Sequence, residues 1–171
     1  MTLFKTVLFS VLLMGTTPLY AETALPEPSQ YLVPETDIFK GKPVPVDLTS
    51  YPKAATYKTK LQEGTQKGAN FAGHYAVVTI GCGTQCQENW VIDVKTGKIL
   101  DKFSSIIGTN FQLGSSLMIV NPPDLQLKKS YEEHPEQPLL GTMETTYEVW
   151  KEDKFDVIHQ DKWINVIKTL P

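Results

Sequence analysis

The stretch "HYAVVTIGCGTQCQENWVIDVKTGKILDKF", residues 74–103, decides which fold class we expect for this chain. Its first seven residues alternate in a way that gives a strand two distinct faces, with His74, Ala76, Val78 and Ile80 on one and Tyr75, Val77 and Thr79 on the other. Residues 89–103 predict a hairpin that turns at Gly97, where a tight turn needs a positive φ. The stretch therefore predicts antiparallel strands joined in series.

The same pattern continues toward the C-terminus. Further strands are predicted over "SSLMIVN" (115–121), "METTYEVW" (143–150) and "KFDVIH" (154–159), and the last two flank the short polar turn "KED". The segment 125–141 is rich in charge and proline and is interpreted as a surface loop. Residues 162–170 fit the period of a strand and that of a helix equally well.

One helix is predicted, over residues 50–68. Ser50 is placed to cap it, Pro52 suits its first turn, and Gly64 or Gly68 would end it. The fold class that we expect is α+β, a mainly antiparallel β-sheet built from serial hairpins with one N-terminal helix.

The chain divides into three parts. Residues 1–21 resemble a secretory signal peptide, because Lys5 precedes an apolar run and "PLYA" offers a cleavage site after Ala21. Residues 22–49 are rich in proline and predict an extended arm, and residues 50–171 predict a single β-rich domain. We therefore expect a periplasmic or secreted protein whose mature chain has no transmembrane segment.

Charge argues against nucleic acid as a partner. The net charge is −3, and removal of residues 1–21 takes away one lysine and no acid, which leaves −4. Binding to phosphates needs clustered positive charge, and the chain contains no arginine to form a bidentate clamp.

Cys82 and Cys86 are the only cysteines, and they pose the main functional question. An even number of cysteines in an exported protein favours a disulfide between them. The alternative is a periplasmic thiol enzyme that uses Cys82, assisted by His74 or Cys86. A regular strand would separate His74 from Cys82 by about 26 Å, at about 3.3 Å per residue, which favours the disulfide.

Other chemistry finds weaker support. Two thiols and His74 give three ligands where structural zinc usually takes four, so no metal or cofactor is expected. Aromatic residues could form a sugar or peptide platform, but their place in the strand patterns favours core packing. The residues concerned are Trp90, Trp150, Trp163, Tyr75, Tyr131 and Tyr147.

Residues 68–99 resemble a group of small exported bacterial proteins that share an Asn-Phe-Ala-Gly-His-Tyr stretch and a Gly-Cys-Gly-Thr-x-Cys turn. The resemblance implies a shared fold and transfers no catalytic role, since the group has no established activity. We therefore expect a non-catalytic, inhibitor-like binding module for a protein or cell-envelope partner. Its candidate binding residues are His74, Tyr75, Thr84 and Gln85, and its oligomeric state is left open.

Overall fold

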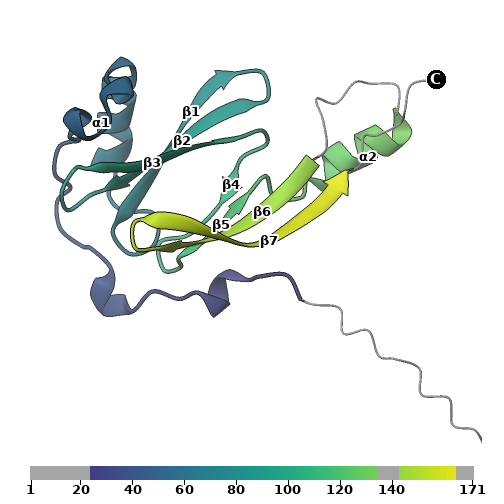
Figure 1. Ribbon diagram of the computed structural model, residues 1–171, viewed down its shortest axis with the longest axis horizontal. Helices are drawn as coiled ribbons and strands as arrows, with labels where there is room; N and C mark the ends of the chain where they lie inside the picture. The colour runs from purple at the N-terminus through teal and green to yellow at the C-terminus, as the bar shows by residue number, and fades with distance from the viewer. Residues whose placement is uncertain (1–23, 135–142, 165–171) are drawn as a thin grey trace, which may run out of the picture.

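Two antiparallel sheets form the protein in the computed structural model, which describes residues 24–134 and 143–164 (Figure 1). The first sheet has the order β1 (Tyr75–Gly83), β2 (Cys86–Asp93), β3 (Ile99–Ser105). The second has the order β4 (Thr109–Asn110), β5 (Leu117–Val120), β6 (Met143–Lys151), β7 (Lys154–Ile164). The predicted α+β class with mainly antiparallel strands is confirmed.

Buried side chains lie on both faces of the first sheet. Val78 and Ile80 share one cluster, which also contains Trp90 and residues of the helical layer. Tyr75 and Val77 belong to a second cluster on the opposite face. This sheet is therefore the middle layer between the helix and the second sheet.

The helical layer begins with the 3-10 helix η4 (Pro52–Tyr57) and continues as α1 (Lys58–Gln66). Pro52 occupies the first turn as expected, and α1 ends before Gly68, whose φ is +100°. The predicted cap is wrong, because the Ser50 hydroxyl does not cap this helix. It accepts a hydrogen bond from the backbone N–H of Ile99 at 2.9 Å and so links the start of this layer to β3.

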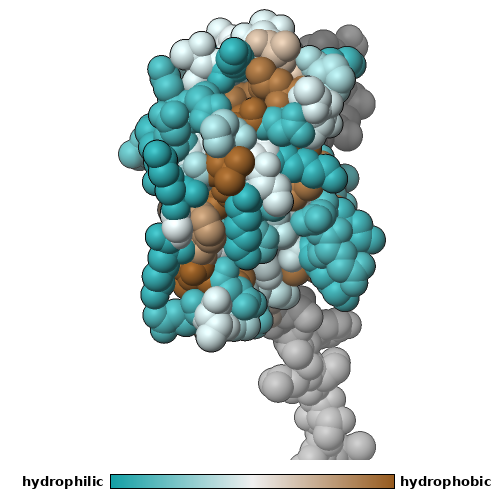
Figure 2. Space-filling view, turned by 90° about the vertical axis from the view of Figure 1, so that its left-hand side faces the viewer, coloured by the Kyte–Doolittle hydropathy of each residue, from teal (hydrophilic) through white to brown (hydrophobic). Residues whose placement is uncertain are grey.

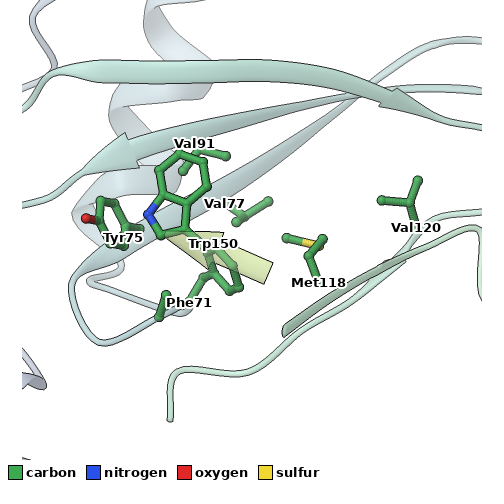
Figure 3. Close-up of a cluster of buried hydrophobic side chains, with 8 residues drawn as sticks. Phe71, Tyr75, Val77, Val91, Met118, Val120 and Trp150 are labelled. Atoms are coloured by element: carbon green, nitrogen blue, oxygen red, sulfur yellow. The ribbon is translucent and has the colours of Figure 1, made fainter. Parts of the chain in front are cut away.

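Aromatic and aliphatic side chains fill the space between the two sheets (Figure 3). Trp150 of β6 lies at the centre of this cluster, with its ring centroid 5.2 Å from that of Tyr75 and 6.3 Å from that of Phe71. Trp90, Trp150, Tyr75 and Tyr147 are buried, which agrees with the expected core packing. The side chains of Tyr131 and Trp163 lie outside the described part of the structure.

Two short turns close one end of the sheets. Gly97 has a φ of +76° and its N–H donates to the Asp93 carbonyl, as the predicted hairpin requires. Between β6 and β7, Glu152 and Asp153 have φ values of +52° and +60°, typical of a two-residue turn whose twist matches its strands.

The proline-rich arm runs across both sheets as extended chain interrupted by three short 3-10 turns: η1 (Pro28–Gln30), η2 (Glu35–Asp37) and η3 (Leu48–Ser50). The N–H of Val33 donates to Gly114 beside the second sheet, and that of Val44 donates to Val94 beside the first. The arm thus ties the two sheets together through backbone hydrogen bonds.

The loop predicted over residues 125–141 contains a helix, and that part of the prediction is wrong. α2 (Leu125–Glu133) begins after Asp124, whose carboxylate accepts hydrogen bonds from the N–H groups of Gln126 and Leu127. This cap stabilises the first turn of a helix that is otherwise rich in charged residues.

Three sequence expectations fall partly or wholly outside the described residues. These are the signal peptide at 1–21, the end of the 125–141 segment and the end of the 162–170 segment, of which residues up to 164 belong to β7. In residues 24–134 and 143–164, no helix combines the length and the apolar character needed to cross a membrane.

Candidate functional site

The β1–β2 hairpin ends in a six-residue tip, Gly81–Cys86, which projects from the first sheet (Figure 1). The strands remain paired up to Gly81 and Gln87, and a register shift follows at the tip. Gly83 and Gln85 have φ values of +139° and +54°, which turn the chain back on itself. The sequence at the tip therefore favours a tight turn at the end of a regular ladder.

Cys82 and Cys86 form a disulfide, which confirms the predicted pairing. Their Cα atoms lie 5.1 Å apart, within the usual range for a disulfide. The bond closes the tip across the register shift. Because both sulfur atoms are in the bond, neither is a thiolate in this state of the protein.

The tip is open to solvent. Residues 81–85 are exposed, Thr84 and Gln85 among them, and Cys86 is half-buried. A Cβ added at Gly81 or Gly83 would meet no atom within 4 Å, so close packing against a neighbouring residue does not require glycine at either position. The tip consequently presents polar side chains and backbone on a loop closed by a covalent bond.

His74 lies at the other end of β1. It immediately precedes the strand, whereas Cys82 is next to its last residue. With about 3.3 Å per residue, the strand keeps the two side chains far apart. The structure therefore does not bring His74 to Cys82, which is one of the two pairings that the thiol-enzyme alternative allows. Thr84 and Gln85 are likewise remote from His74 and Tyr75.

Several elements meet around His74. Its ring lies over that of Tyr75, with centroids 4.1 Å apart, and its carbonyl accepts a hydrogen bond from Val94. Its Nδ1 is buried and has no hydrogen-bond partner among the described residues. Burial lowers the pKa of His74, and the charge of Lys95 acts in the same direction. Folding thus favours the neutral imidazole.

Tyr75 is buried, and its hydroxyl donates a 2.9 Å hydrogen bond to Oδ1 of Asp153 in the β6–β7 turn. Burial is the largest of the causes that raise the pKa of Tyr75 to about 12. The phenol is therefore neutral at physiological pH and links β1 to the second sheet.

The β6–β7 turn lies on the left of Figure 1, and Figure 2 shows the molecular surface on that side. This surface is mostly hydrophilic, and its apolar groups are small and separate.

A third group of polar residues lies on the helical side of the first sheet. Lys102 of β3 forms an ion pair with Glu88 of β2, and its Nζ lies 5.4 Å from the centroid of the Trp90 ring. The hydrogen bond from Lys102 is the main cause that lowers the pKa of Glu88. Sequence reasoning missed this pair. Glu88 is directly opposite Ser104 and Lys102 is directly opposite Trp90, so the two charges meet diagonally across neighbouring strands.

A shallow hollow of about 460 Å³ lies between the β3–β4 loop and the start of α2. Its lining residues are Ile107, Pro122, Pro123, Asp124, Leu125 and Gln126. Among the described residues, no three His, Cys, Asp or Glu side chains are grouped so that they could hold a metal ion.

Fold and site together define an α+β protein of two antiparallel sheets that carries a disulfide-closed hairpin tip. In comparisons with known proteins, no protein-family model, no curated protein and no solved structure matches the chain.

Proposed function

We propose that this chain is an exported, non-catalytic binding module that contacts a protein or cell-envelope component through the Gly81–Cys86 tip. The observation that carries the proposal is the exposed tip closed by the Cys82–Cys86 bond. A loop already held in one shape loses less conformational entropy on binding than a free loop does. Inhibitors that insert a rigid loop into a partner use the same physical advantage.

Export is part of the proposal. A structural disulfide persists in oxidising compartments, and the sequence of residues 1–21 is typical of a secretory signal. We further infer that the exported proteins resembling residues 68–99 share this hairpin and its bond. Thr84 and Gln85 would make the contact, whereas His74 and Tyr75 lie at the other end of β1 and would act on the fold.

The test is a co-sedimentation assay with cell envelopes from the organism that produces the protein. The tip variant Thr84→Lys/Gln85→Lys should bind at least about tenfold more weakly, because it places two charges at the centre of the contact. The matched control, Thr59→Lys/Gln66→Lys, makes the same changes at exposed positions of α1 and should bind like the unmodified protein. Equal binding by both variants would contradict the proposal.

A further inference from the structure

β7 is the last strand of the second sheet, and one of its long edges has no strand partner in the described part of the chain. Two neighbouring apolar side chains on this strand are exposed, Val157 by 55 % and Ile158 by 42 %. A long edge strand with apolar side chains is a template for pairing with another strand, and proteins usually protect such an edge. The edge therefore suggests an interface.

A bulge in β7 determines which of its side chains share a face. Tyr147 pairs with His159 and Glu148 pairs with Val157, so Ile158 is an extra residue between them. Because residues opposite each other lie on the same face, Phe155 and Val157 share a face with Gln160 and Lys162. The other face carries Lys154, Asp156, His159 and Asp161.

Two copies of β7 that pair antiparallel are related by a twofold axis perpendicular to the sheet. Each residue must therefore pair with a residue of the second copy whose side chain lies on the same face of the sheet. An axis between Val157 and Ile158 meets this condition. It sets Lys154 opposite Asp161 of the second copy and Asp156 opposite its His159. Every one of these contacts occurs twice, and the two exposed apolar residues meet at the centre.

Neighbouring registers are less favourable. An axis through Val157 or through Ile158 sets residues of opposite faces against each other, because the bulge shifts the alternation. An axis between Ile158 and His159 keeps the faces but places Asp156 opposite Asp161, and like charges directly opposite destabilise a strand pair. Charge and face together favour a single register.

We propose that two copies of this chain associate through antiparallel pairing of β7, with Val157 opposite Ile158, so that the second sheet continues across both copies. The occupant of the edge is thus a second copy of the same chain. The proposal is independent of the tip, because β7 belongs to the second sheet and the tip extends from the first.

Sedimentation velocity over a wide range of protein concentrations tests this proposal. The unmodified protein should dimerise reversibly. Lys154→Glu and Asp161→Lys should each weaken the dimer by about tenfold, since each replaces two attractive pairs with two repulsive ones. The double variant Lys154→Glu/Asp161→Lys restores opposite charges and should return the dissociation constant close to its original value.

Lys60→Glu, an exposed charge reversal on α1, is the matched control and should leave the dimer unchanged. If a charge variant does not fold, Val157→Lys takes its place, because it puts a lysine at the axis on a side chain that is already exposed, and it should abolish the dimer. A protein that is monomeric at every concentration overturns the proposal, and so does one whose edge is occupied only when another protein is added. A double variant as weak as the single ones also overturns it.

Discussion

At the residue scale, Gly97 shows how a single atom limits substitution. It has a φ of +76°, and a Cβ built on it would lie 2.1 Å from the carbonyl oxygen of Pro45 in the arm. Gly68 also has a positive φ, +100°, but a Cβ there would meet nothing within 4 Å. The two glycines thus separate the cost of backbone conformation from the cost of a steric clash.

We expect Gly97→Ala to lower the free energy of unfolding by about 2–4 kcal/mol, because it adds a clash with backbone to the cost of the left-handed conformation. Gly68→Ala should cost only about 1 kcal/mol. Urea unfolding of both variants measures the difference. Equal losses would mean that the arm moves away from the turn without cost.

Residue-scale features were predictable where their cause is local. The positive φ of Gly97 follows from the tight hairpin in which it lies, and it was expected. Its contact with Pro45 could not be expected, because the two residues are far apart in sequence and no pattern in either segment records the other. The same holds for Tyr75 and Asp153, which are separated by 78 positions.

At the element scale, the disulfide shapes the tip more than it stabilises the domain. It closes a ring with a sequence separation of 4, and the entropy that so short a ring removes from the unfolded chain is small. The β1–β2 ladder is held independently by backbone pairing from Tyr75 to Gly81. The hairpin therefore does not depend on the bond for its existence.

We expect Cys82→Ser/Cys86→Ser to lower the free energy of unfolding by about 2 kcal/mol and to leave the fold intact. Circular dichroism and urea unfolding measure both effects. In the unmodified protein, neither cysteine should react with an alkylating reagent under denaturing conditions unless a reductant is present. Alkylation without reductant would contradict the disulfide and would favour the thiol enzyme.

The elements differed in how readily the sequence predicted them. The three strands of the first sheet were expected, β1 from the period of two in residues 74–80 and β2 and β3 from the hairpin turn at Gly97. Burial on both faces of β1 was not predicted. α2 was missed, since its charged residues and the prolines beyond it resemble a loop. Asp124, directly after Pro122 and Pro123, was the available signal, because an aspartate in that position commonly caps a helix.

At the scale of the whole molecule, His74 connects the stability of the protein to pH. The charged groups around it come from three separate segments, with Asp37 in the arm, Asp93 and Lys95 at the β2–β3 turn and Asp153 at the β6–β7 turn. Burial is the main reason that its pKa lies below the ordinary value of 6.5. The unfolded chain consequently takes up a proton at His74 more readily than the folded protein does.

The contribution of His74 to stability is therefore present above about pH 6.5 and is lost as the pH falls below that value toward the folded-state pKa. We expect the unfolding free energy of the unmodified protein to fall over this range relative to that of His74→Gln. Urea unfolding at a series of pH values measures this difference, and an NMR titration should place the pKa of His74 below 6.5. A difference that does not change with pH would contradict the prediction.

The arm has a consequence for the order of folding. A ribosome makes the arm before the rest of the domain, yet the hydroxyl of Ser115 reaches the carbonyls of Pro28 and Tyr31 across 87 and 84 positions. These contacts cannot form until most of the chain has been synthesised, whereas the β1–β2–β3 sheet pairs neighbouring strands and can form from local sequence. The arm is thus the first part of the described chain to be synthesised and among the last to form its native contacts.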